Sequence, residues 1–153
     1  MKTLTLDIKP KKGLGELAFG MTLEQVYNFL GRPDEKEILD DEVEIETLIL
    51  HYDDPDISLF LEGEGDKKVL VNIETDNPNA LMWGKAVFAM KRPDIIALMK
   101  ENGYKERDTE VHEDKLEYPE EDRVSFDEAM TDFFFEDDIL TAVSWGDVPP
   151  DML

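Results

Sequence analysis

Two stretches of thirteen residues, 74 positions apart, decide the fold of this chain. They are residues 50–62, LHYDDPDISLFLE, and residues 124–136, VSFDEAMTDFFFE, and they align without a gap. In each stretch, an apolar segment is followed by an acidic turn and an alternating apolar segment, which is the pattern of a β-hairpin. The repetition predicts that the chain contains two copies of one structural unit.

The sequence around each hairpin repeats as well. A third apolar segment follows the hairpins, at residues 69–75 and 139–145. Ahead of them, residues 18–21, AFGM, recur 69 positions later as residues 87–90, VFAM. Each of these runs leads into a segment with helical apolar spacing. The repeated order is therefore a helix followed by three strands.

Both expected helices have start and stop signals. Thr22 and Gln25 form a capping-box pattern at the start of the first helix, and Gly31 ends it. Pro93 suits the first turn of the second helix, which ends at Gly103.

We therefore predict an α+β fold: two tandem copies of a helix plus a three-stranded antiparallel meander, forming one layered α/β-sheet structure. A single domain over residues 1–153 would contain repeats of about 13–76 and 82–146 and an N-terminal strand over residues 2–8. The second copy has about five extra residues, which fall in the acidic stretch 105–122.

The charge is strongly negative and evenly spread. The chain has 16 Lys and Arg against 38 Asp and Glu, for a net charge of −22, and residues 1–76 and 77–153 each carry 8 basic and 19 acidic residues. We expect neither nucleic acid nor an anionic membrane surface as a partner, because both attract basic chains. A basic protein would be steered toward such a surface. The alternative is that the acidity serves solubility or a saline habitat.

The chain contains no cysteine, which excludes disulfides and thiolate metal sites and suits a reducing compartment. Residues 1–8 lack the apolar segment of a signal peptide, and no apolar run reaches the ~18 residues that span a bilayer. We expect a cytoplasmic protein.

A family resemblance lies in residues 13–26, GLGELAFGMTLEQV, and in residues 30–33, LGRP. This run resembles the opening of proteins in the β-lactamase-inhibitor-protein-like group, which includes small outer-membrane assembly lipoproteins. The resemblance implies a sheet whose concave face grips another protein, and it implies no catalytic residue. The chain differs from the lipoprotein branch, since it has no lipid-bearing cysteine.

No pattern of catalytic or metal-binding residues is present. His51 and His112 lie far apart and without ligand spacing, and residues 53–56 and 136–138 lack the spaced oxygens and central glycine of a calcium loop. Gly-x-Ser-x-Gly, Walker and zincin motifs are absent as well. We expect a non-enzymatic protein without a cofactor.

Alternation along the strands assigns side chains to two faces, one carrying Leu59, Leu61, Phe133 and Phe135. The other face carries the candidate binding residues, which are His51, Ser58, Phe60, Glu62, Asn72, Ser125, Asp132, Phe134, Glu136 and Ser144. An aromatic side chain ringed by polar groups is how protein-binding hot spots are usually built. The alternative is that a helix or the other repeat covers this face and makes both aromatics core residues.

These observations predict a protein-binding module with a basic protein partner, such as an immunity-type protein that neutralises a basic toxin. Two alternatives remain open. One is a small-molecule-binding or enzymatic domain with a site between the sheets. The other is a structural module that forms a homo-oligomer by pairing the exposed sheet face with its own copy.

Overall fold

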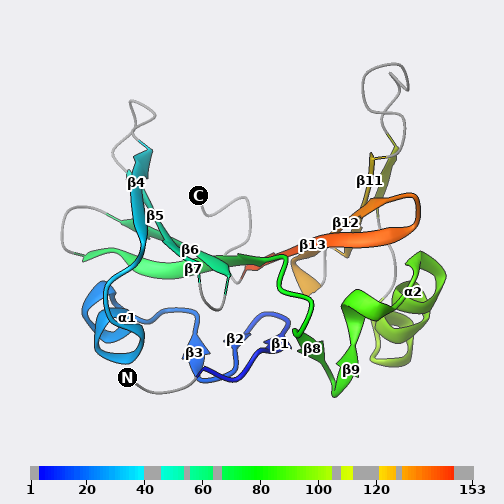
Figure 1. Cartoon of the computed structure of the whole chain (residues 1–153), viewed down its shortest axis with the longest axis horizontal. Coiled ribbons are helices and arrows are strands. Elements are labelled where there is room, and N and C mark those ends of the chain that lie inside the picture. The colour runs from blue at the N-terminus through cyan, green and yellow to red at the C-terminus, as the bar shows by residue number, and fades with distance from the viewer. Residues whose placement is uncertain are drawn as a thin grey trace.

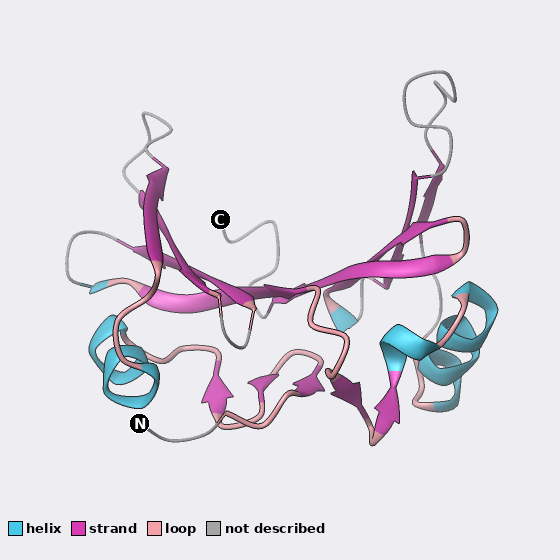
Figure 2. Cartoon of the chain, in the orientation of Figure 1, coloured by secondary structure: helices cyan, strands magenta, loops and turns pink. Residues whose placement is uncertain are grey.

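The computed structural model describes residues 4–39, 46–53, 56–63, 67–104, 108–111, 121–126 and 129–146. In this part of the chain, the structure consists of two α-helices and two β-sheets, and strands dominate (Figures 1 and 2).

The larger sheet contains eight strands within the described residues. They are β4 (Glu35–Leu39), β5 (Glu46–Tyr52), β6 (Ile57–Gly63), β7 (Val69–Thr75), β10 (Asp108–Val111), β11 (Glu121–Phe126), β12 (Thr131–Glu136) and β13 (Ile139–Gly146). Their spatial order is β10-β11-β12-β13-β7-β6-β5-β4, and every neighbouring pair is antiparallel. The last strand of each copy, β7 or β13, therefore lies at the centre, and the two copies join there into one continuous sheet.

The smaller sheet contains five short strands among the described residues. They are β1 (Asp7–Lys9), β2 (Gly13–Leu14), β3 (Leu17–Ala18), β8 (Leu81–Met82) and β9 (Lys85–Ala86). β1 pairs with β8 in parallel, with Ile8 opposite Met82, so this sheet also joins the two copies.

The first helix, α1 (Leu23–Leu30), begins directly after its N-cap residue, Thr22. The Gln25 amide donates to the Thr22 hydroxyl, and the Thr22 amide donates to the Gln25 side chain, which completes the capping box. Val26 and Leu30 are buried, and they anchor the helix on the larger sheet.

The second helix, α2 (Arg92–Glu101), has Pro93 in its first turn and follows a 3₁₀ turn, η2 (Val87–Ala89). A proline there loses no hydrogen bond, because the first amides of a helix have no partner within it. The buried residues of α2 are Ile95, Leu98 and Met99.

Both helices and the smaller sheet lie against one face of the larger sheet (Figure 1). They share a single hydrophobic core, in which Trp145 is fully buried and its indole N–H donates a 2.9 Å hydrogen bond to the Gly13 carbonyl. Of the helices and strands that the structure describes, none crosses the opposite face, which we call the open face (Figure 2).

The larger sheet bends so that its open face is concave (Figure 1). A β-bulge interrupts the β6–β7 pairing between Phe60 and Leu61, and another interrupts the β12–β13 pairing between Phe134 and Phe135. A bulge places an extra residue in one strand and increases the local bend and twist. The two bulges lie 74 positions apart, so each copy bends at the same point of its meander.

The predicted fold class, two helices each with a three-stranded meander in one α+β layer, is wrong. Each meander has four strands, because β4 and β10 precede the three expected ones, and a separate five-stranded sheet is present within the described residues. The strand predicted over residues 2–8 is β1 (Asp7–Lys9), and residues 1–3 lie outside the described ranges. The sequence of β4, EKEIL, is mostly charged, and β10 falls in the acidic stretch 105–122, so neither shows apolar alternation.

Candidate functional site

The open face carries the candidate binding residues. In β6 and β12 the residues facing the core are buried, while the alternate ones are partly or fully exposed. Glu136 is exposed. The other predicted residues whose side-chain environment is described are half-buried: His51, Ser58, Phe60, Glu62, Asn72, Asp132, Phe134 and Ser144. The backbone of Ser125 pairs with that of Asp132, and His112 lies outside the described residues.

A row of polar residues crosses the open face through the junction of the two copies. Each residue lies directly opposite the next on the neighbouring strand, in the order His51, Ser58, Glu74, Ser144 and Asp132. Direct neighbours on one face have Cβ atoms about 5 Å apart. The strand register therefore brings together side chains that are up to 93 positions apart in the sequence.

Hydrogen bonds fix several of these side chains. A 2.8 Å bond joins His51 Nδ1 to the Ser58 hydroxyl, and Asn72 Nδ2 donates a 3.0 Å bond to the Ser144 hydroxyl. These hydrogen bonds thus restrict the orientation of several polar groups on the face.

Phe60 and Phe134 flank the polar row. Phe60 lies on β6 opposite Asn72, Phe134 lies on β12 opposite Ala142, and each directly precedes a bulge. The two rings occupy equivalent places in the two copies, separated by three strand spacings of about 4.8 Å each. Both are half-buried, so each keeps part of its apolar surface accessible on the concave side.

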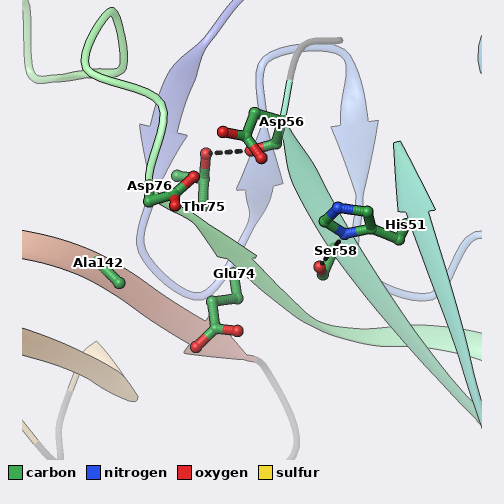
Figure 3. Close-up of a pocket in the computed structure, with 7 residues that line it drawn as sticks. All are labelled: His51, Asp56, Ser58, Glu74, Thr75, Asp76 and Ala142. Carbon is green, nitrogen blue, oxygen red and sulfur yellow. Dashed lines mark hydrogen bonds between the residues drawn. The ribbon is translucent and has the colours of Figure 1, made fainter. Parts of the chain in front are cut away.

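A hollow of about 220 Å³ opens on this face beside the junction (Figure 3). Figure 3 shows three carboxylates around it, from Asp56, Glu74 and Asp76, with His51 and Ser58 on the opposite side. Thr75 and Ala142 complete the lining, and the Thr75 hydroxyl donates a 2.9 Å bond to the Asp56 carbonyl.

The carboxylates of the hollow are crowded. Burial, and then the charge of Asp76, raises the pKa of Glu74. A side-chain hydrogen bond with Asp76 is the main cause that raises the pKa of Asp56, followed by burial. Both shifts mean that negative charge in the hollow is destabilised, and that a cation placed there would relieve the destabilisation.

The sequence prediction missed these three acidic residues. Glu74 lies two positions after Asn72 on β7, so the alternation that selected Asn72 also places Glu74 on the open face. Asp56 lies directly before β6 and Asp76 directly after β7, where alternation does not apply, and only the β6–β7 pairing brings them together.

His51 also contacts Asp53, but Ser58, His51 and Asp53 do not form a hydrolytic triad. Ser58 bonds to Nδ1, the nitrogen that holds the carboxylate in such triads, while Nε2 is 3.6 Å from an Asp53 oxygen. That distance exceeds a hydrogen bond, and the Asp53 side chain is 73% exposed. Nor does any group of three or more His, Cys, Asp or Glu within the described residues form a metal-binding cluster.

Comparison with known proteins yields one distant structural similarity. No protein-family model matches the chain, and no curated protein matches it significantly. A 1.5 Å crystal structure of an extracellular protein containing a SCP domain, from Bacillus anthracis str. Ames, is 14% identical with a TM-score of 0.46. The alignment covers 92% of this chain and 50% of that one, so the chain spans about half the length of that protein. Among the described helices, none has both the length and the apolar character needed to cross a membrane.

Proposed function

We propose that this chain is a non-catalytic protein-binding module that takes a basic partner on the open face of its larger sheet. The observation that carries this proposal is the pair of half-buried aromatics, Phe60 and Phe134, on either side of a polar row on a concave sheet. Large aromatic side chains amid polar groups provide most of the energy in many protein interfaces. The concave shape would let a convex partner contact both rings at once.

Charge selects the class of partner. With a net charge of −22, the chain attracts positively charged proteins at long range and repels acidic ones. At short range, the hollow beside Glu74 and Asp76 suits a lysine or arginine side chain, whose cation would offset the crowded carboxylates. Capture by charge and docking of the aromatics would then be successive steps of one association.

A basic toxin, such as a nuclease, is a partner of this kind, and the chain would then act as an immunity-type protein that covers the toxin's basic surface. A cytoplasmic location belongs to the same proposal, because an immunity-type protein must meet the toxin where the toxin acts. No enzymatic step or cofactor is required, since occupation of the toxin's surface suffices.

Two alternative uses of the fold are less well supported. In a small-molecule site between the sheets, the ligand would have to displace core residues, because Ile8, Leu14 and Met82 of the smaller sheet pack with Trp145 of the larger one. Pairing of the open face with a second copy would bring two highly negative surfaces together, which is unfavourable at low salt.

The test is a capture experiment with matched variants. Three proteins are immobilised: wild type, the double variant Phe60→Ala/Phe134→Ala, and the control Ile38→Ala. The control removes an exposed apolar side chain from edge strand β4. Lysate of the source cell and proteins secreted by its neighbours are applied at low salt and at ~0.5 M salt, where the Debye length falls well below ~10 Å.

The proposal predicts that wild type and Ile38→Ala retain one basic protein at low salt. The double variant should not retain this protein, and high salt should elute it from wild type. Equal retention by the double variant, or a neutral partner whose binding ignores salt, would contradict it. Sedimentation velocity of the free chain at low salt addresses self-association: a dimer that Phe60→Asp dissociates would support the structural-module reading instead.

A further inference from the structure

A second hollow, of about 400 Å³, lies at the edge of the smaller sheet. Because β1 runs parallel to β8, the turn after β1 and the turn after β8 leave the sheet at the same edge. The first copy contributes the lysine-bearing turn at residues 10–12, and the second copy contributes Trp83 and Gly84. The lining residues are Asp7, Ile8, Lys9, Pro10, Lys12, Trp83, Gly84 and Tyr104.

The aromatic wall of this hollow is unusually exposed. The Trp83 side chain is 38% accessible, whereas Trp145 is completely buried. The Trp83 ring stacks on Tyr104, with centroids 6.1 Å apart and planes inclined by 23°. Tyr104 therefore supports the indole and restricts its orientation, while part of the indole surface is left for another flat group.

The backbone under Trp83 is strained. Its φ is 50°, in the left-handed region that glycine and asparagine normally occupy, and Gly84 follows with φ 77°. Lys11, in the turn on the other side of the hollow, has a φ of 66°, so both turns that border the hollow contain a left-handed residue other than glycine. The turn thus holds a large aromatic side chain where folding alone favours a small residue.

The charge of the hollow is opposite to that of the molecule. Two lysines, Lys9 and Lys12, line it against one carboxylate, Asp7. Lys9 Nζ donates a 3.3 Å bond to the Gly15 carbonyl, which orients this ammonium group. Glu16 lies near enough for the charge of Lys9 to help lower its pKa. At physiological salt the Debye length is about 8 Å, so a ligand in the hollow responds mainly to Lys9, Lys12 and these nearby carboxylates, and only weakly to the distant acidic surface.

We infer that this hollow binds a small anion that carries a flat ring. The ring would stack on Trp83, and the phosphate or carboxylate would pair with the ammonium groups of Lys9 and Lys12. A volume of about 400 Å³ suits a ligand of mononucleotide size. The smaller sheet lies on the far side of the larger one from the open face (Figure 1), so this site does not depend on the proposed protein-binding surface.

The 153-residue chain offers a direct test by ¹H–¹⁵N NMR, because it has two tryptophans and hence two indole N–H signals. The probes are two ring-bearing anions: adenosine monophosphate, which carries a phosphate, and 4-hydroxybenzoate, which carries a carboxylate. Adenosine and inorganic phosphate, the two parts of adenosine monophosphate, are the controls. Trp83→Phe assigns the signals, and the Trp145 signal reports an intact core in every variant.

We expect at least one of the two ring-bearing anions to shift the Trp83 signal saturably while Trp145 stays unchanged; the tighter of the two identifies the preferred anionic group. Adenosine and phosphate alone should bind more weakly. Lys12→Ala should weaken binding about tenfold, the effect of one charge-assisted hydrogen bond, whereas the exposed control Lys36→Ala should not.

Three results would overturn the inference. The first is no Trp83 shift with either ring-bearing anion at millimolar concentration. The second is unchanged binding by Lys9→Ala/Lys12→Ala. The third is an equal shift of both indole signals, because that would report a general change of the core.

Discussion

Asn72 and Ser144 belong to different copies of the repeated unit, and the amide of Asn72 donates a 3.0 Å hydrogen bond to the hydroxyl of Ser144. The bond crosses the β7–β13 pairing, beside the backbone partners Asn72 and Gly146. Side chains therefore reinforce the backbone ladder at the one place where the two meanders meet.

Gly146 permits this arrangement, and Gly146→Ala should destabilise the junction. A Cβ at this position would lie 2.8 Å from Asn72 Oδ1 and 2.8 Å from the Val71 carbonyl oxygen. We expect a loss of about 1–3 kcal/mol in the free energy of unfolding, measured by urea denaturation. Adding Asn72→Ala should recover part of that loss, since only the backbone contact would remain. Equal stability of Gly146→Ala and wild type would show that the strands are farther apart than described.

The assignment of the two faces predicts unequal costs for neighbouring phenylalanines. Phe133 is completely buried, so Phe133→Ala should cost about 3–5 kcal/mol. Phe134 is half-buried on the open face, so Phe134→Ala should cost no more than about 1–2 kcal/mol. Chemical denaturation of the two variants checks this order, and a reversed order would mean that the open face is covered in the folded chain.

Tyr52 connects β5 to the end of α1, because its hydroxyl donates a 2.9 Å bond to the Gly31 carbonyl. Burial is the main cause that raises the pKa of Tyr52 to about 12. The neutral Tyr52 phenol therefore contributes to the free energy of unfolding at a pH below the ordinary tyrosine pKa. This contribution is lost as the pH rises through the pKa of Tyr52 in the folded state. Tyr52→Phe should cost about 1 kcal/mol at neutral pH and should remove the ionisation at a pH of about 12 from an ultraviolet titration. Tyr104→Phe, at a tyrosine that is not among the groups acting on Tyr52, is the control, and it should leave that ionisation in place.

The crowded carboxylate Glu74 should make folding less favourable at neutral pH. Because burial raises its pKa, the folded state holds the proton more tightly than the unfolded state does. The stability that protonated Glu74 contributes is therefore present at a pH below the ordinary glutamate pKa, and it is lost as the pH rises through the raised pKa of Glu74. Glu74→Gln should therefore be more stable than wild type at pH ~7, with a smaller difference at pH ~4. Denaturation curves at the two pH values measure this, and Glu62→Gln on the same face is the control.

The carboxylate of Glu16 should behave in the opposite way. It accepts 2.8 Å bonds from the amide and the hydroxyl of Thr5, and these bonds lower the pKa of Glu16. Its contribution is present above the ordinary glutamate pKa and is lost as the pH falls through the lowered value. Glu16→Gln should accelerate hydrogen exchange of the Thr5 amide at neutral pH, whereas Glu37→Gln on β4 should not. Unchanged exchange would show that the Thr5 amide has another acceptor.

The sequence predicted the central strands because each of them has a buried face. The alternation that separates Leu59 and Leu61 from Ser58 and Phe60 is also the burial pattern of β6. The edge strands β4 and β10 were not predicted, because an edge strand needs little apolar surface. Charged side chains are common on edge strands, where they prevent pairing with other chains. In β4, Glu35, Lys36 and Glu37 are all exposed.

The acidic hollow shows a second limit of local patterns. Asp56 and Asp76 are 20 positions apart, at the start of β6 and the end of β7, and the β6–β7 register sets their proximity. The second hollow has the same origin on a larger scale, since 71 positions separate Lys12 from Trp83 and the parallel pairing of β1 with β8 brings them together. Sites of this kind follow from the order of strands in a sheet, which single-segment periodicity does not encode.

The central position of β7 and β13 has a consequence for the symmetry of the molecule. A chain with only one copy would leave β7 as an unpaired edge, and two such chains could pair through it as a symmetric dimer with two identical wings. With both copies in one chain, each wing is the permanent partner of the other, and the two need not be the same. His51 and Ser58 can then differ from their counterparts Ser125 and Asp132, so a single molecule can present an asymmetric surface to an asymmetric partner.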